Sequence, residues 1–148
     1  MKFLINFFIT KPQNITSHFN FIGPLFTRIV VGYVFMKTGF SKLENIELII
    51  ENFKYWGIPY AEFTTPLVAY FEAIGGLFII AGFLTRISSA ALSVIMAVAI
   101  ISVKISDIDS LETLFGFEES TYFAVFCWLA ISGPGKASFD HLITRKIK

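Results

Sequence analysis

Four stretches of mainly apolar residues, of which the fourth is short, alternate with more polar segments along the chain. They cover residues 21–43, 65–84, 87–105 and 120–132, and glycine and proline residues separate them. A helix needs about 20 mainly apolar residues to cross a bilayer. The pattern therefore predicts an all-α polytopic membrane protein, an antiparallel bundle of four transmembrane helices that forms one membrane domain over residues 1–148.

The polar segment after the first stretch has a helical pattern of its own. Apolar residues recur there at helical spacing, while charged residues occupy another face. The apolar positions are Ile46, Ile49, Ile50, Phe53 and Trp56, and the charged ones are Glu44, Glu47, Glu51 and Lys54. We expect an amphipathic helix in the first outer loop that lies on the membrane surface or caps the bundle.

Composition agrees with a membrane environment. Of the 148 residues, 55% are hydrophobic, 16% are charged and 18 are Phe, and the mean hydropathy is +0.69. These values lie far from those of an average soluble domain. We expect residues 1–20 to be retained as a cytoplasmic interfacial segment and residues 133–148 to form a cytoplasmic tail.

The distribution of charge predicts an orientation. Lysine and arginine concentrate in the N-terminal segment, the second loop and the C-terminal tail, whereas most acidic residues fall in the two other loops. The positive-inside rule then places both termini in the cytoplasm. An acidic outer surface argues against nucleic acid as a partner, and the basic tail is suited to anionic membrane lipids.

Charged residues also lie within the apolar stretches, where they are costly and usually functional. Glu72 interrupts the run from Pro66 to Leu84. Projected at 100° per residue, two stripes combine charges with glycine. The first stripe contains Arg28, Gly32, Phe35, Gly39 and Lys42, and the second contains Glu72, Gly76, Ile79, Phe83 and Arg86. We expect Gly32, Gly39, Gly75 and Gly76 to serve helix packing.

Packing of the two stripes predicts which charges meet. In an antiparallel arrangement Glu72 comes level with Lys42, and Arg28 is its second candidate partner. Arg28 and Arg86 share the inner side, where Asp140 is the carboxylate able to fold back onto one of them. Two interpretations are open: ion pairs that only fix the bundle, or a binding site with Glu72 as a proton acceptor.

Several motifs, taken in order, resemble those of the DoxX family of small four-helix bacterial membrane proteins. They are Arg28-x3-Gly32-x6-Gly39-x2-Lys42-Leu43, Gly57-Ile58-Pro59, Glu72-x2-Gly75-Gly76-Leu77, Gly82-x2-Thr85-Arg86 and Gly133-Pro134-Gly135-x2-Ser138-x-Asp140. The resemblance implies the bacterial cytoplasmic membrane and polar family positions at Arg28, Lys42, Glu72, Arg86 and Asp140. It also implies quinone-linked, sulfur, thiol or oxidative-stress contexts, as in the membrane subunit of a thiosulfate:quinone oxidoreductase.

The residue inventory restricts the redox chemistry available to the chain alone. Cys127 is the only cysteine, so an intramolecular dithiol is excluded. His18 and His141 both fall in cytoplasmic flanks, which argues against a bis-histidine haem within the bundle and against a metal centre. We therefore expect no intrinsic cofactor, and at most an oxidoreductase subunit that acts with partners.

A lipid-soluble electron carrier is compatible with this set of residues. We expect quinone to bind between the first two helices, with Glu72 as proton acceptor and Lys42 or Arg28 polarising a carbonyl. Aromatic residues offered as its walls are Phe35, Tyr70, Phe71, Phe83, Tyr122, Phe126 and Trp128, all of which core packing also explains. The alternatives are a non-catalytic scaffold for partner enzymes and a small-solute or metal transporter, in which two copies would enclose a path.

Overall fold

A computed structural model describes residues 21–147, and every regular element in that range is helical. The predicted interfacial segment 1–20 lies outside the described residues. The elements are α3 (Ile22–Glu44), α4 (Ile46–Tyr55), α5 (Ala61–Ala81), α6 (Thr85–Ala99), the π-helical turn η2 (Ile100–Lys104), the 3₁₀ turn η3 (Ile105–Asp107), α7 (Leu111–Gly116), α8 (Glu118–Ser132) and α9 (Phe139–Ile147). The all-α prediction is confirmed for this part of the chain.

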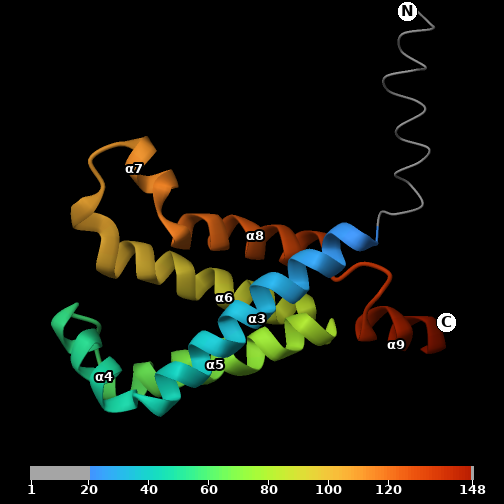
Figure 1. Cartoon of the computed structure of the whole chain (residues 1–148), viewed down its shortest axis with the longest axis horizontal. Helices are drawn as coiled ribbons and strands as arrows, with labels where there is room; N and C mark the ends of the chain where they lie inside the picture. Colours follow the sequence, from blue (N-terminus) through green and yellow to red (C-terminus); the bar gives the residue numbers. More distant parts are fainter. Residues whose placement is uncertain (1–20, 148) are drawn as a thin grey trace, which may run out of the picture.

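The long helices form two packed pairs. Helix α3 lies along α5, α6 lies along α8, and α5 joins the pairs through its contact with α6 (Figure 1). The α3–α5 pair is antiparallel, because Gly32 meets Gly76 while Gly39, further along α3, meets Ala69, which is earlier in α5.

Glycines bring the backbones of α3 and α5 into direct contact. A Cβ atom on Gly32 would lie 2.7 Å from the Gly76 carbonyl oxygen, and one on Gly39 would lie 2.7 Å from the Ala69 carbonyl oxygen. Such distances leave no room for a side chain, so these positions allow the helices to approach closely. Gly75 instead faces α6, where the Leu92 side chain would lie 3.5 Å from an added Cβ atom.

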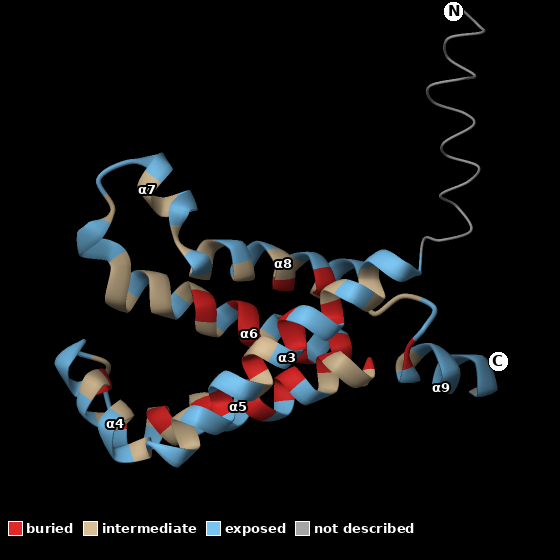
Figure 2. Ribbon diagram, viewed as in Figure 1, coloured by how far each residue is buried: buried red, intermediate tan, exposed pale blue. Residues whose placement is uncertain are grey.

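One apolar core joins all four long helices (Figure 2). Its buried members are Val31, Phe35, Ile79, Leu92, Met96, Phe126 and Leu129. The Phe35 ring makes edge-to-face contacts with Tyr122 and Phe126, at centroid distances of 5.1 and 4.7 Å. These three aromatic side chains therefore hold α3 against α8 and do not wall a ligand slot between α3 and α5.

The outer faces of the long helices are also apolar. Exposed large side chains include Phe26, Ile29, Tyr33, Leu67, Phe71, Ile74, Ile87, Val94, Ile101, Trp128 and Ile131. A soluble monomer rarely exposes so much contiguous apolar surface, whereas lipid would cover it. Among the described residues, two helical stretches are long and apolar enough to cross a membrane: Ala61–Ala81 and Thr85–Asp107, the latter comprising α6, η2 and η3.

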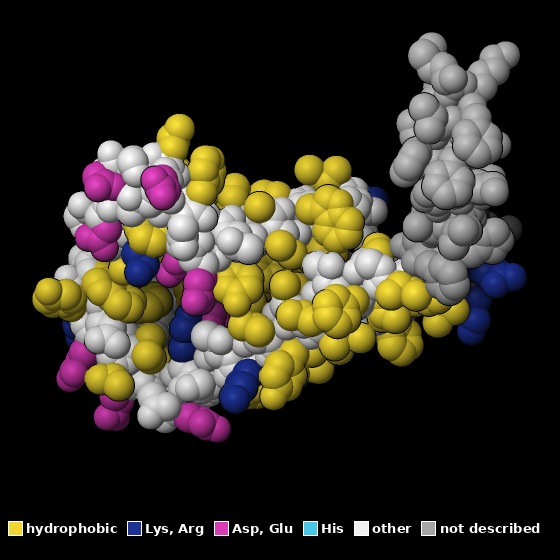
Figure 3. All heavy atoms as spheres, turned by 45° about the horizontal axis from the view of Figure 1, so that its top comes forward, with side chains coloured by type: hydrophobic (Ala, Val, Ile, Leu, Met, Phe, Trp, Pro, Cys, Tyr) yellow, Lys and Arg dark blue, Asp and Glu magenta, His cyan; other side chains and the backbone are white. Residues whose placement is uncertain are grey.

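Charged side chains lie mainly at the two ends of the molecule. Figure 3 shows acidic side chains gathered at the end that carries α4 and α7, which we call the acidic end. The loops and helix termini at this end supply Glu44, Glu47, Glu51, Glu62, Asp107, Asp109, Glu112, Glu118 and Glu119. The opposite end, called the α9 end, carries Lys136, Arg145 and Lys146.

Candidate functional site

The Lys42 ammonium and the Glu72 carboxylate form an ion pair between α3 and α5. The Lys42 Nζ atom donates to the Glu72 Oε1 atom over 2.7 Å. The Glu72 side chain is 2% exposed, whereas that of Lys42 is 24% exposed and reaches the surface. The structure thus gives Glu72 the partner favoured by the helical stripes, and Arg28 lies near the other end of α3.

The local sequence favours this pair. Lys42 belongs to the last turn of α3, where a cation interacts favourably with the helix dipole. Glu72 lies in the middle of α5 among the small buried residues Ala69, Ala73 and Gly76, which let α3 come close enough for its lysine to reach the carboxylate.

The second oxygen of Glu72 has no hydrogen-bond partner among the described residues, although it is buried. A buried carboxylate oxygen without a partner is costly. The Oε2 atom can therefore accept a hydrogen bond from a ligand or from water.

A cavity of about 370 Å³ lies beside the ion pair, between α4, α5, α6 and η2. Its volume is within the range typical of small-molecule sites. Polar lining is limited to Lys42, Glu72, Thr64 and Glu119. The remaining walls are apolar: Ile49, Phe53, Trp56, Ile58, Leu67, Val68, Val94, Ile95, Met96, Val98, Ala99 and Val103.

The position of this cavity corrects the predicted binding slot. A slot between the first two helices, α3 and α5, is incompatible with their glycine-mediated backbone contact. The space adjoining Glu72 opens on the other side of α5. Its aromatic walls are Phe53 and Trp56, which were predicted from the sequence only as part of the amphipathic helix. The apolar face of α4 could have predicted this role for Phe53 and Trp56, because an apolar face that is turned towards the bundle can line a cavity.

Arg28 lies near the α9 end and is 1% exposed. Its Nη2 atom donates to the Ala137 carbonyl oxygen, while Nε and Nη1 have no partner among the described residues. Gly82 permits this burial, since a side chain there would collide with the guanidinium group. Gly82 also has a φ of +72°, which favours glycine independently.

Asp140 folds back onto the turn between α5 and α6. Its Oδ1 atom accepts the Leu84 N–H over 2.8 Å and its Oδ2 atom accepts the Thr85 N–H over 3.0 Å. Asp140 also donates its backbone N–H to the Gly82 carbonyl oxygen over 2.9 Å. The carboxylate thereby satisfies backbone donors at the start of α6, where negative charge is favourable.

The expected direct ion pair of Arg28 with Asp140 is not formed. Within residues 21–147, the ion pairs are Lys42–Glu72 and the exposed Lys54–Glu62, at 2.7 and 2.8 Å. Asp140 is bound instead by backbone amides, which are fixed in place by the turn. Arg86 is exposed and donates to the Ala130 carbonyl oxygen over 3.3 Å, so Arg28 and Arg86 do not share a carboxylate.

No metal centre is apparent in the described part of the chain, where no three histidine, cysteine or acidic side chains are placed to hold an ion. Cys127 on α8 is a half-buried free thiol. The polar groups that line the cavity are therefore the Lys42 ammonium group, the carboxylates of Glu72 and Glu119 and the Thr64 hydroxyl.

Helices able to cross a bilayer, an apolar outer surface and charge at both ends define an integral membrane protein. The chain belongs to the DoxX family, whose model matches residues 23–105. The inner membrane protein YqjF of Escherichia coli is 29% identical over 125 residues, which cover 84% of this chain and 95% of YqjF.

Two further relatives match different fractions of the length of the chain. The putative oxidoreductase CatD of Bacillus subtilis is 34% identical over 84 residues, covering 57% of this chain and 61% of CatD. The uncharacterized membrane protein Rv3486 of Mycobacterium tuberculosis is 27% identical over 130 residues, covering 80% of each. No solved structure matches the chain significantly.

Proposed function

We propose that this protein is a membrane subunit of a redox complex and binds a quinone in the cavity beside Lys42 and Glu72. The observation that carries the proposal is the buried Glu72 side chain, which lines an apolar cavity of about 370 Å³ and whose Oε2 atom has no hydrogen-bond partner among the described residues. A quinone matches this combination, since it has an apolar ring and polar groups at its edges.

The two charged groups have complementary roles in this proposal. Lys42 donates a hydrogen bond to a quinone carbonyl, and Glu72 accepts one from a quinol hydroxyl. Reduction of a quinone consumes two electrons and two protons. In the reverse reaction, oxidation of the quinol, the Glu72 carboxylate accepts one of the two protons, water accepts the other, and a partner protein takes up both electrons. Similarity to CatD, a putative oxidoreductase, supports a redox setting.

The proposal includes a four-span arrangement in the bilayer. Helix α3 has 23 residues and a length of about 34 Å, enough to span a hydrocarbon core of about 30 Å. Helix α8 has 15 residues, about 22 Å, and exposes Trp128 and Ile131, so the bilayer thins around it. The α9 end faces the cytoplasm by the positive-inside rule, and α4 lies at the outer surface.

The direct test measures quinone affinity with the full chain in lipid nanodiscs. We expect Glu72→Gln and Lys42→Met each to weaken binding about tenfold, because each removes a charge-assisted hydrogen bond. Glu62→Gln and Lys54→Met are matched controls, since they alter an ion pair of similar length outside the cavity, and should leave affinity unchanged. Wild-type protein that does not bind quinone would refute the proposal.

The scaffold interpretation remains the second candidate. The observation in its favour is that Lys42–Glu72 joins the same two helices that the glycines bring together, as a purely structural pair would. If the protein is a scaffold, the double variant Lys42→Met/Glu72→Leu should still recover its partner proteins in a mild-detergent pull-down. If it has a redox role, the recovered complex should have lost quinone-dependent electron transfer.

A further inference from the structure

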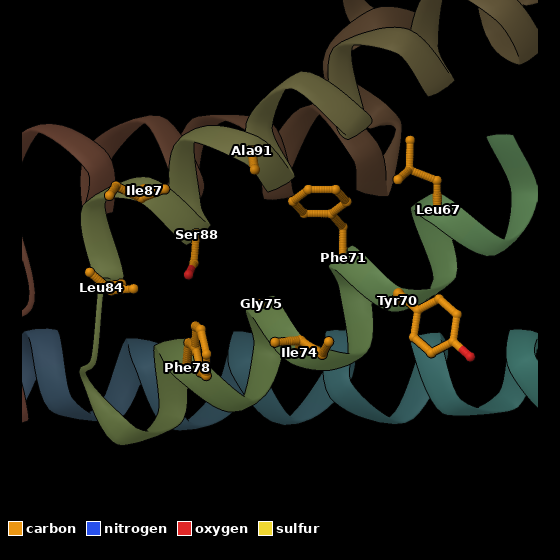
Figure 4. Close-up of a pocket in the computed structure, with 10 residues that line it drawn as sticks. All are labelled: Leu67, Tyr70, Phe71, Ile74, Gly75, Phe78, Leu84, Ile87, Ser88 and Ala91. Carbon is orange, nitrogen blue, oxygen red and sulfur yellow. The ribbon is translucent and has the colours of Figure 1, made fainter. Parts of the chain in front are cut away.

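A second cavity, of about 260 Å³, lies in a groove between α5 and α6. Figure 4 shows Ser88 and Ala91 pointing from α6 towards Ile74 and Phe78 on α5. The lining is apolar except for the Ser88 hydroxyl and the distal Tyr70 hydroxyl: Leu67, Tyr70, Phe71, Ile74, Gly75, Phe78, Leu84, Ile87, Ser88 and Ala91. Gly75, Ser88 and Ala91 are small and leave the space that the larger side chains border. We call this cavity the α5–α6 groove.

The α5–α6 groove and the cavity beside the ion pair are neighbours. Leu67 on α5 lines both of them, and along α6 the groove, bordered by Ile87 to Ala91, precedes the cavity, bordered by Val94 to Ala99. From Leu67 to Phe78 the helix rises roughly 16 Å. A ligand with its polar group at Glu72 can therefore extend along the groove without leaving apolar surroundings.

We propose that the α5–α6 groove holds the hydrocarbon tail of the ligand whose polar ring lies beside Lys42 and Glu72. The ligand class is a neutral, hydrogen-bonding ring with a long branched or isoprenoid chain. This inference rests on the proposed function and adds the length and position of the tail.

Electrostatics favours a neutral ring over a phospholipid headgroup at the end of this groove. The opposite charges of Lys42 and Glu72 cancel, and Glu119 leaves the lining of the cavity with a net negative charge. A phosphate group there would face carboxylates at short range in a poorly hydrated site, which is repulsive. A quinone or quinol ring carries no such charge.

The test compares two ligands with the same ring, one with a long isoprenoid tail and one with a methyl group in its place. The measurement is the affinity of the full chain in nanodiscs. We expect wild-type protein to bind the long-tailed ligand at least fivefold more tightly. Ala91→Phe, which fills the groove from α6, should abolish that preference and leave the affinity of the methyl ligand unchanged.

The matched control is Ala124→Phe, which adds the same side chain to an exposed position on α8 outside both cavities. It should retain the preference for the long tail. Ala91→Leu is a smaller filling change that keeps the test usable if Ala91→Phe does not fold. Cross-linking from a photoreactive group at the tail end should label the segment 67–91.

The outcomes separate the two proposals. If wild-type protein binds both ligands equally, the tail inference is refuted and the quinone site stands. If it binds neither, both proposals fail. A photoreactive phospholipid that labels the segment 67–91 while the tail-labelled quinone does not would show that bulk lipid occupies the groove, which also refutes the inference.

Discussion

Helix α3 carries a buried or half-buried cation near each of its ends, and the two cations have different hydrogen-bond partners. At the acidic end Lys42 contacts the carboxylate of Glu72 directly. At the α9 end Arg28 donates to the Ala137 carbonyl oxygen, while Asp140 is held by backbone amides. Helices α3 and α5 are thus linked by an ion pair between side chains at the acidic end. At the α9 end, the charged side chains form hydrogen bonds to the backbone.

The difference has a physical consequence for what each end can do. Backbone amides in a turn cannot move without unfolding it, so the network around Arg28 and Asp140 fixes α9 and the α5–α6 turn. The Lys42 side chain is flexible, and Glu72 retains a free oxygen beside a cavity. We therefore assign stability to the α9 end, whereas the ligand site that we propose lies at the acidic end.

The largest effect is expected from Gly82→Ala, compared with Gly57→Ala. Both glycines have positive φ, +72° and +70°, so both substitutions bear a conformational cost of roughly 1–2 kcal/mol. At Gly82 the new methyl group also collides with Arg28, whereas nothing lies within 4 Å at Gly57. We expect a loss of about 3 kcal/mol for Gly82→Ala in denaturant unfolding in micelles. Equal losses would contradict the packing of Arg28 under Gly82.

Asp140→Ala is expected to cost about 2 kcal/mol of unfolding free energy, because it leaves the Leu84 and Thr85 amides without their acceptor. The control is Glu51→Ala on α4, an exposed position where the change should stay within about 0.5 kcal/mol. Hydrogen exchange at the Leu84 and Thr85 amides should rise in Asp140→Ala. Unchanged exchange there would argue against the capping role.

A double-mutant cycle on Lys42 and Glu72 should give a coupling free energy of about 1.5 kcal/mol, typical of a hydrogen bond between charged groups. Lys42→Met and Glu72→Leu are suitable changes. The same cycle on Lys54 and Glu62 provides the contrast, because that pair is solvent-exposed, and it should show a much smaller coupling. Similar couplings would mean that burial does not distinguish the two pairs.

The smallest effect is expected from Arg86→Ala. The side chain is exposed and makes a long hydrogen bond of 3.3 Å to the Ala130 carbonyl oxygen. Its removal should change the free energy of unfolding by no more than about 0.5 kcal/mol. A loss comparable to that of Asp140→Ala would place Arg86 within the network of the α9 end.

Helical periodicity was sufficient to predict which faces of α3 and α5 meet. The stripes with Gly32, Gly39 and Gly76 lie at the observed contact, and Lys42 reaches Glu72. Periodicity describes one helix at a time, however. It could not show that α4 would border a cavity with Phe53 and Trp56, because that depends on how α4 packs against α5.

The contacts of Asp140 could not be predicted from the sequence, for a different reason. Side-chain charges suggested an arginine as its partner, whereas the structure provides the amides of Leu84 and Thr85. Every residue except proline has a backbone N–H group, so composition gives no signal for such a partner. Only the left-handed conformations of Gly82 and Leu84 turn these amides towards the carboxylate.

The hydrogen bond from Arg28 to Ala137 also sets an order of events during biosynthesis. The two residues are 109 positions apart in the chain. At translation rates of about 5–20 residues per second, roughly 5–20 s pass between the synthesis of the two residues. During that interval the nascent protein holds an arginine without its acceptor. The buried guanidinium group of Arg28 can thus gain its backbone acceptor only late in synthesis, after residue 137 has been added.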